Sequence, residues 1–367
     1  FSKNMDWSNV TLNPVIIGKE NKRLRIFGSL TLADSSAMNF DYEGETFFSS
    51  KNQGNTIYSG KNAFNNDVIF EGVYGEWSLS DTLFIDANVS FLVGHLNLNG
   101  KGLITGKFIS THSRTKSLDI SSSYMQIKSG VKNKKDYNMK CDSLTLNHSN
   151  SLIELSANNA WFYNSGTGNI IYDKILFSAI DSLKKDKKGK IQTFNPNIKY
   201  NKVTFLNNGK LLGPNKFDTL IFSPSRTYVL ESSNTQTIIN EWDFNSDCNN
   251  YIKIRSDSDN TQANRLKING DVNGSYLQLK DLNAIVNVNY NANQSFDLGN
   301  NTGWNISPTT PLQLYWVNGE GDWFDPNHWS YSSGGSGGAC IPTKKDNVYF
   351  DANSFPNDSS KTVTDTN

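Results

Sequence analysis

The hexapeptide YNKVTF at residues 200–205 is followed, a short distance along the chain, by FDTLIF at residues 217–222. Both place an aromatic residue first, then two polar residues, an aliphatic residue, a variable residue and Phe. Related patterns are FNNDVIF (64–70), YDKILF (172–177) and KDNVYF (345–350). Because a pattern that returns along a chain is typical of repeat architectures, these copies predict units that stack on one another.

The rest of the chain has the period of β-strands. Runs such as LRIFGSLTL (24–32) and DSLTLNHSNSLIELS (142–156) alternate apolar and polar residues. Gly, Asn, Asp or Ser interrupts each run after about four to six residues, where a turn is expected. Helical periodicity is almost absent, so the sequence predicts an all-β fold.

Two β architectures fit these runs: antiparallel sandwiches, and a parallel β-helix whose coils each contribute two or three strands. The aliphatic positions of the repeated pattern are Val68, Leu83, Leu144, Ile175, Val203 and Leu220. Successive positions are separated by about 15 to 30 residues, except for the second interval, which is about twice as long. We interpret each interval except the second as one coil and favour a parallel β-helix, or β-solenoid, of about 15 rungs and about 70–80 Å in length.

In such a coil the aliphatic and Phe side chains point inward and stack on their equivalents in the neighbouring coils. Asn, Ser and Thr at the corners can form hydrogen-bonded ladders along the axis, and Asn tolerates the positive φ of tight corners. The lysine-rich segments VKNKKDYNMK (131–140) and SLKKDKKGK (182–190) are then expected to be solvated loops that leave the coil.

The charge balance excludes some partners. The 367 residues include 35 Lys and Arg and 35 Asp and Glu, so the formal net charge is zero at pH 7. A neutral chain lacks the electrostatic attraction that nucleic acids need, and we expect no nucleic-acid partner. No apolar run approaches the roughly 20 residues of a membrane helix, so no membrane span is expected. The start, FSKNMDW, lacks signal-peptide character and is interpreted as the interior of a longer protein.

The three cysteines, Cys141, Cys248 and Cys340, lie far apart and lack the spacing of a zinc site. Two redox states are possible for these cysteines. Buried free thiols are the interpretation that we favour. One disulfide with one thiol left over is the alternative in an oxidising compartment.

The pattern changes near residue 307. Pro308 and Pro311, with Ser and Thr around them, mark a linker over residues 307–313. Residues 1–306 are then the body of the solenoid. Residues 314–367, which we call the tryptophan segment, carry three Trp residues close together and are expected to be an irregular piece that begins a second module.

Two kinds of side chain in the tryptophan segment suggest a role. Its tryptophans are expected to pack at a structural junction between modules, and a platform that stacks on sugars is the alternative; they are Trp316, Trp323 and Trp329.

Calcium is the one cofactor that the sequence suggests, because hard oxygen ligands could meet if the segment folds back on itself. Those ligands are Asp322, Asp325, Asn327, Asp346 and Asp351. The alternative is that they form Asx turns and caps around the tryptophans.

Three stretches resemble a known family. They are WVNGEGDWFDPNHWS (316–330) with IPTKKDNVYFDANSF (341–355), FNNDVIFEGVYGEWSLSDTLFI (64–85) and SFDLGNNTGWNI (295–306). They are similar to the repeat modules of the giant SprB-like gliding-motility adhesins of Bacteroidetes. In that family the tryptophan-rich stretch opens a module, whereas here it stands near the end. The resemblance therefore implies one repeat of a filament, cut at a permuted point.

The same resemblance implies a function and a location. Family members are exported by the type IX route and displayed on the cell surface, attached to the outer membrane, where they grip the substratum during gliding. The implied partners are neighbouring repeats of the same polypeptide, an extracellular surface or polysaccharide, and the gliding and secretion machinery, which would act through other parts of the protein. On this interpretation the chain is a structural and adhesive repeat.

The alternative function is that of a carbohydrate-binding or carbohydrate-cleaving β-helix protein, although we expect no enzyme. Many parallel β-helices bind or cleave polysaccharides, and carboxylates in SDSDN (256–260) and FDANSF (350–355) could serve such a reaction. Both stretches have the character of turns. The histidines are isolated and lack the spacing of a metal or nucleophile site; they are His95, His112, His148 and His328.

Four tripeptides of Asp, a hydroxyl residue and Leu resemble the O-glycosylation signal of Bacteroidetes. The hydroxyl residues are Thr82, Ser143, Ser182 and Thr219. Three of the four coincide with the coil pattern, so structural repetition explains them equally well.

Overall fold

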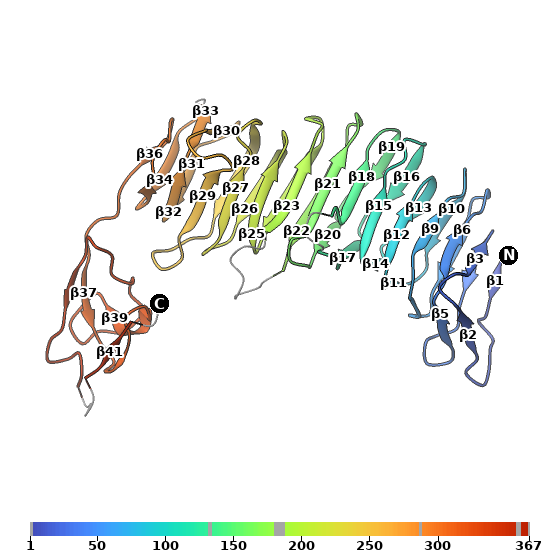
Figure 1. The fold of residues 1–367 in the computed structure, drawn as a ribbon, viewed down its shortest axis with the longest axis horizontal. Coiled ribbons are helices and arrows are strands. Elements are labelled where there is room, and N and C mark those ends of the chain that lie inside the picture. The colour runs from blue at the N-terminus through green and yellow to red at the C-terminus, as the bar shows by residue number, and fades with distance from the viewer. Residues whose placement is uncertain (1–2, 131–133, 180–187, 286–287, 357–360, 366–367) are drawn as a thin grey trace.

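The computed structural model describes residues 3–130, 134–179, 188–285, 288–356 and 361–365. Strands dominate these residues, and the one helix among them is the 3-10 turn Pro326–His328. No helix in the described ranges has the length and hydropathy of a membrane span. The strands stack into one elongated body, and the two ends of the chain lie on opposite sides of the molecule (Figure 1).

Three long sheets run along this body, and their strand pairs are parallel. The longest has thirteen strands, in the order β3 (Arg23–Ile26), β6 (Glu45–Phe48), β9 (Val68–Phe70), β12 (Asn88–Phe91), β15 (Lys107–Ser110), β18 (Tyr137–Lys140), β21 (Trp161–Ser165), β23 (Lys188–Thr193), β25 (Asn208–Leu212), β27 (Thr227–Leu230), β29 (Ile252–Ser256), β32 (Leu277–Lys280) and β35 (Phe296–Asp297).

The second sheet has eleven strands, namely β8 (Ala63–Phe64), β11 (Leu83–Ile85), β14 (Gly102–Thr105), β17 (Tyr124–Ile127), β20 (Leu152–Leu155), β22 (Ile171–Phe177), β24 (Lys199–Phe205), β26 (Lys216–Phe222), β28 (Gln236–Phe244), β30 (Ala263–Lys267) and β33 (Leu282–Ile285). The third has seven, namely β1 (Met5–Asp6), β4 (Leu30–Thr31), β7 (Asn55–Tyr58), β10 (Glu76–Leu79), β13 (Gly94–Asn97), β16 (Lys116–Asp119) and β19 (Leu144–Asn147).

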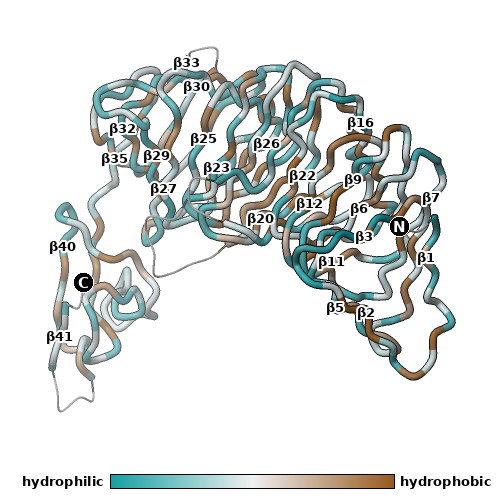
Figure 2. Tube along the Cα trace, turned by 45° about the vertical axis from the view of Figure 1, so that its right-hand side comes forward, coloured by the Kyte–Doolittle hydropathy of each residue, from teal (hydrophilic) through white to brown (hydrophobic). Residues whose placement is uncertain are grey.

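From β7 to β21, each coil visits all three sheets in turn. Strands β10, β11 and β12 form one coil, and β13, β14 and β15 form the next, directly paired with the first. Buried and half-buried residues alternate along strands such as β10, β12 and β17, and Figure 2 shows brown and teal segments mixed along the body. The predicted parallel β-helix is therefore confirmed.

Short sheets complete both ends of the body. The first pairs β2 (Val15–Gly18) with β5 (Asn39–Tyr42). The second pairs β31 (Val272–Ser275), β34 (Tyr290–Asn293) and β36 (Asn305–Ile306), and forms a third face again in the last coils. The tryptophan of the GNNTGW stretch, Trp304, packs against this end of the core with its ring centroid 5.3 Å from that of Tyr290.

The coils between these regions have two faces. The seven-stranded sheet ends at β19, and the strands β22, β24 and β26 are then seven residues long, against four for β14 and β17. The repeated hexapeptides are these long strands. Their first aromatic residues pair in register from coil to coil and are fully buried; they are Tyr172, Tyr200 and Phe217.

The two polar residues of the motif mark a bend. In YNKVTF, Tyr200 and Val203 are both buried, although three positions apart, and the residues between them are half-buried or exposed. A flat strand would place positions three apart on opposite faces. The bend returns the chain to the interior, so the aromatic residue fills the space that a strand of the third sheet occupies elsewhere.

The column that decides the architecture is formed as predicted. Ile175 of β22 pairs with Val203 of β24, which pairs with Leu220 of β26. Each is at most 1% exposed. Behind them Phe177 and Phe205 stack with ring centroids 4.4 Å apart. Continuous apolar columns of this kind hold neighbouring coils together.

The other copies of the pattern are not equivalent positions. Val68 lies in the thirteen-stranded sheet, Leu83 in the eleven-stranded sheet and Leu144 in the seven-stranded sheet. FNNDVIF crosses the corner between β8 and β9, and KDNVYF lies outside the solenoid. The interpretation of the first and third intervals as single coils is therefore wrong, because an inward-facing alternation marks any strand and does not identify its sheet.

The coils are also fewer than predicted. The longest sheet has thirteen strands, against about 15 expected rungs. Coils differ in length because their corner loops differ: the coil that separates Ser117 from its partner Thr145 is longer than the coil that separates Val203 from Leu220. A chain of fixed length forms fewer coils when its coils are longer.

Buried polar side chains in the two-faced region satisfy one another. Asn164 lies in the interior, where its carbonyl accepts a hydrogen bond from the Tyr172 hydroxyl at 2.7 Å. Its amide donates to the Tyr200 hydroxyl at 3.0 Å, and the Thr193 hydroxyl lies 2.5 Å from that oxygen. All four residues are fully buried, so each contact replaces a lost hydrogen bond to water.

Predicted ladders of polar side chains follow the outer surface. The Asn291 amide donates to Asn273 at 2.8 Å, and the Asn305 amide donates to Asn291 at 3.1 Å. Asn283 likewise donates to Asn264 at 2.9 Å. These side chains occupy equivalent places in successive coils, but they lie within the strands β30, β31, β33, β34 and β36. Ladders of Asn are therefore present, whereas their predicted position at the corners is wrong for these residues.

The lysine-rich segments are loops only in part. Residues 131–133 and 182–187 lie outside the described residues. Residues 137–140 belong to β18 and residues 188–190 to β23, so the prediction that these whole segments are loops is wrong. Their Lys residues alternate with inward-facing residues, which is the period of a strand and not of a loop.

Candidate functional site

The tryptophans form the core of their own segment. Trp316 and Trp329 are fully buried, with ring centroids 5.1 Å apart, and Trp323 packs edge-on against Trp329 at 4.8 Å. Leu314 and Ala339 complete this core, which is separate from that of the body. Since Trp316 and Trp329 are buried, their rings offer no face to a sugar.

Short strands hold this core. β37 (Gln313–Trp316) pairs antiparallel with β39 (Trp329–Ser330) and parallel with β40 (Asn347–Tyr349). β38 (Gly321–Asp322) pairs with β41 (Val363–Thr364). The Trp316 indole donates to the Gly319 carbonyl at 2.6 Å, so this buried N–H is satisfied. The packing of these tryptophans against a second module stays a prediction.

A disulfide ties the tryptophan segment to the body. Cys248 lies in the loop between β28 and β29, and Cys340 follows a Gly/Ser-rich loop; their Cα atoms are 5.5 Å apart. Cys141 is a buried free thiol. The favoured expectation of three free thiols is therefore wrong, and the alternative of one disulfide with one thiol left over is confirmed.

Hydrogen bonds at the disulfide hold the same two parts together. The Asn249 amide donates to the Ala339 carbonyl at 3.2 Å, and its carbonyl accepts from the Ile341 N–H at 2.7 Å. The sequence pattern did not predict this contact. The available signal is local: Cys248 and Cys340 lie in turn-rich loops, whereas Cys141 follows the inward alternation of β18.

A cavity of about 230 Å³ lies beside the disulfide, with walls from both parts of the chain. Tyr251 and Tyr276 of the body line one side, with ring centroids 5.6 Å apart, and Tyr331 lines the other. Burial raises the pKa of Tyr251 to about 12. The cavity walls therefore combine these tyrosine rings with polar side chains such as Gln294 and Thr343.

The predicted calcium ligands are distributed over several turns. Asp325 accepts from the Asn327 N–H at 2.9 Å and caps the 3-10 turn. The Asp346 carboxylate accepts hydrogen bonds from the Thr343 and Leu312 N–H groups. The Asp351 carboxylate accepts one from the Asn353 N–H. Asp322 accepts from the Phe324 N–H at 2.8 Å.

The structure does not bring these side chains to one centre. Within the described ranges, no group of three or more His, Cys, Asp or Glu residues is arranged to hold a metal ion. The observed contacts are those of Asx turns, which was the alternative interpretation. Calcium binding stays a prediction without support from this geometry.

The predicted glycosylation residues differ in exposure. Ser143 is exposed at the corner before β19, with φ +53°. Thr82 is half-buried and accepts from the Gly102 N–H, and Thr219 is half-buried in β26. Ser182 lies outside the described residues. Ser143 is thus the accessible hydroxyl of the three that are described.

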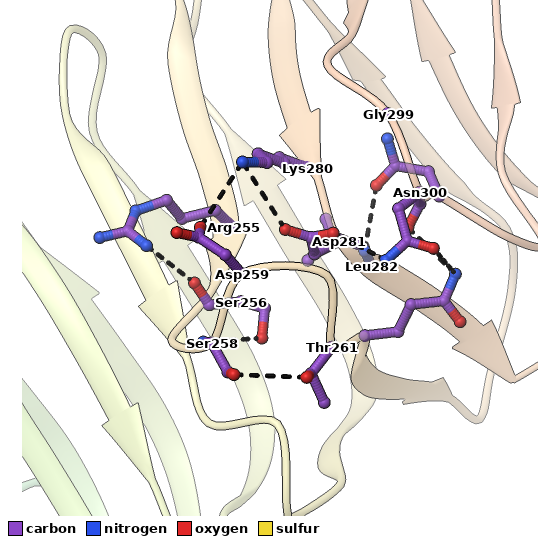
Figure 3. A network of polar contacts seen from close by, with 12 residues as sticks. Arg255, Ser256, Ser258, Asp259, Thr261, Lys280, Asp281, Leu282, Gly299 and Asn300 are labelled. Atoms are coloured by element: carbon purple, nitrogen blue, oxygen red, sulfur yellow. Dashed lines mark hydrogen bonds and ion pairs between the residues drawn. The ribbon is translucent and has the colours of Figure 1, made fainter.

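The carboxylates of SDSDN are engaged in ion pairs on neighbouring coils. Asp257 lies 3.7 Å from Lys210 and accepts from the Ser232 N–H. Asp259 lies 3.5 Å from Lys280, which also lies 4.0 Å from Asp281 (Figure 3). These contacts account for the carboxylates as structural groups that join coils.

Comparison with protein-family models, with curated proteins and with solved structures finds no match to this chain. The resemblance to gliding adhesins therefore depends on the sequence alone, namely on the tryptophan-rich stretch, residues 64–85 and residues 295–306.

Proposed function

We propose that the chain is a structural repeat of a long filamentous cell-surface adhesin that extends from the outer membrane and mediates attachment during gliding. The observation that carries the proposal is the unbroken thirteen-stranded parallel sheet, which extends along the whole body. A stack of this length makes a stiff spacer. Because each coil contacts only its neighbours, the stack can be extended by repetition.

The disulfide supports a mechanical role. Tension that reaches Cys340 would pass to Cys248 through the S–S bond and bypass the chain between these cysteines, which have a sequence separation of 92. β40 and β41 follow Cys340 and pair with β37 and β38, so they would bear the load before the disulfide does. Disulfides persist in oxidising compartments, which supports a location outside the cytoplasm.

Exposed apolar side chains at the amino-terminal end support contact with a neighbouring repeat. Leu12 is 97% exposed and Ile17 of β2 is 73% exposed. They lie at the end of the body where β1, β2 and β3 each form the edge of a sheet. An edge of this kind invites pairing or coverage by another chain. The preceding copy of the same polypeptide would supply that cover.

Electron microscopy tests whether consecutive copies of the chain form a stiff rod. A chain of three consecutive copies of residues 1–367 is compared with a single copy, and the expected result is an unbranched particle whose length increases in proportion to copy number. Compact particles, or beads at variable angles, would contradict the proposal. Protease treatment of intact cells tests the location separately, since a surface filament is digested while cytoplasmic proteins survive.

A further inference from the structure

A hollow lies on the corner between the thirteen-stranded and seven-stranded sheets. Three successive coils turn this corner with loops of different length: residues 71–75, residues 92–93 and residues 111–115. The short middle loop leaves space between the two longer ones, which are two rungs apart, or about 10 Å. The resulting pocket has a volume of about 520 Å³. That volume lies within the range of roughly 300–1,000 Å³ that is typical of small-molecule sites.

Glycine keeps the floor of this pocket deep. Gly94 has φ +99°, and a Cβ atom added to it would lie 2.6 Å from the Gly72 carbonyl oxygen and 2.8 Å from that of Gly75. The neighbouring His95 N–H donates to the same Gly75 oxygen at 2.8 Å. Any other residue at position 94 would force the loops apart, so the backbone forms the floor.

Polar side chains cover the floor at regular spacing. His95, Ser117 and Thr145 pair in register on three successive strands, β13, β16 and β19, and all line the pocket. Nε2 of His95 is buried and has no hydrogen-bond partner among the described residues. A buried polar atom without a partner is uncommon in folded proteins and is a place where a ligand group can bind.

The two walls differ in character. Tyr74 on the first loop is 80% exposed and has φ +67°, a conformation that is strained for an aromatic residue. Arg114 on the third loop is exposed and lines the opposite side. None of the described residues that line the pocket is Asp or Glu; Glu76 and Asp119, on the same sheet, lie outside it.

We propose that this pocket binds one acidic sugar, a hexuronate residue of a polysaccharide chain. The Tyr74 ring would stack on the C–H face of the sugar, and the Arg114 guanidinium would bind its carboxylate in charge-assisted hydrogen bonds. Ser117, Thr145 and His95 supply hydrogen-bonding groups for the hydroxyls. Arg114 is the exposed cationic side chain of the pocket, since Lys116, which also lines it, is buried and donates to the His112 carbonyl. One exposed arginine suits a single carboxylate and not a polyphosphate backbone.

This inference goes beyond the proposed rod and does not depend on it, because a single copy contains the complete pocket. Isothermal titration of residues 1–367 with trigalacturonate, and with neutral galactotriose as the matched sugar, tests it. We expect the acidic trisaccharide to bind and the neutral one to bind about tenfold or more weakly, the size expected when a charge-assisted contact is missing.

Two variants locate the binding. Arg114→Gln should weaken trigalacturonate binding about tenfold and leave galactotriose unchanged. Tyr74→Gly should weaken both sugars about fivefold. Glycine adopts φ +67° without strain, so this variant should fold at least as well as the parent, and its thermal midpoint checks that. The matched controls, Arg23→Gln and Phe194→Ala, change an exposed arginine and an exposed aromatic residue outside the pocket.

Three results would overturn the inference. They are no heat of binding for either sugar at millimolar concentration, equal affinity for the acidic and neutral sugars, and equal loss in the control variants. None of them bears on the rod, which is judged by particle length alone. A rod that fails to bind sugar and a sugar-binding chain that fails to form a rod are therefore distinguishable.

Discussion

The disulfide makes a quantitative prediction, because its two partners lie in separately packed parts of the chain. The double variant Cys248→Ser/Cys340→Ser removes the tie while both cores stay intact. When the body remains folded and only the tryptophan segment opens, the closed loop runs from the last body strand, which ends at Ile306, to Cys340. Loop-closure entropy for a loop of about 34 residues stabilises the segment by about 3.8 kcal/mol.

Hydrogen exchange measures that difference locally. The free energy of opening of β37 should fall by about 3.8 kcal/mol, which is about a 600-fold loss of protection. The body strand β24 should not change, because its pairs with β22 and β26 are distant from the cysteines in the stack. The Asn249 hydrogen bonds, worth about 1 kcal/mol each, remain in the variant.

The reasoning would be refuted by either of two outcomes. If β37 keeps its protection in the double variant, the tryptophan core holds itself in place and the disulfide is dispensable. If β24 and β37 lose protection together, the two parts unfold as one unit and the closed loop is the whole chain from Cys248 to Cys340, a sequence separation of 92. Reduction of the disulfide in the parent protein should reproduce the effect of the double variant. This control distinguishes loss of the S–S bond from any effect of the serine side chains.

Three further outcomes follow from packing and burial. Phe205→Ala should destabilise the body by about 3–5 kcal/mol in urea unfolding, whereas the outward Thr204→Ala should change it by less than about 0.5 kcal/mol. Gly94→Ala should cost about 3 kcal/mol through strain and overlap, against about 1 kcal/mol for Gly54→Ala, which is strained but has open space. Burial raises the pKa of Cys141 to about 12, so at pH 8 about one thiol in 10,000 is ionised. A thiol reagent should then detect no thiol in the native protein, one after unfolding and three after unfolding with reductant.

The architecture could be predicted because each strand shows, by its alternation of apolar and polar residues, which side chains are buried. In YNKVTF and FDTLIF the aliphatic and Phe positions must leave water, and only coils stacked in register bury all copies at once. The face to which a strand belongs could not be predicted in this way. Val68 and Leu83 carry the same local pattern on different sheets, because the pattern encodes inward direction and not position around the coil.

The local pattern marks Cys248 and Cys340 as loop residues, but it does not show that they pair with each other. Cys248 and Cys340 are brought together only when the tryptophan segment folds onto the loop after β28, across a separation of 92 residues. The turns that hold the predicted calcium ligands need no such long-range contact. Asp325 and Asp346 lie close together in the sequence, yet each completes a turn of its own, since a local Asx hydrogen bond needs no long-range closure.

The pocket shows how a solenoid can acquire a binding site without changing its core. The inward residues of β10, β13 and β16 pair in register through the region, so the interior is the same beneath the pocket as beside it. What differs is the length of the corner loops, since the short loop at residues 92–93 lies between two longer ones. Loop length is almost free of constraint from the core, because corners lie at the surface and tolerate insertion. Lengthening the middle loop by about three residues should therefore fill the hollow and abolish sugar binding while the thermal midpoint stays within a few degrees. A large loss of stability in that variant would show instead that the corner and the core are coupled.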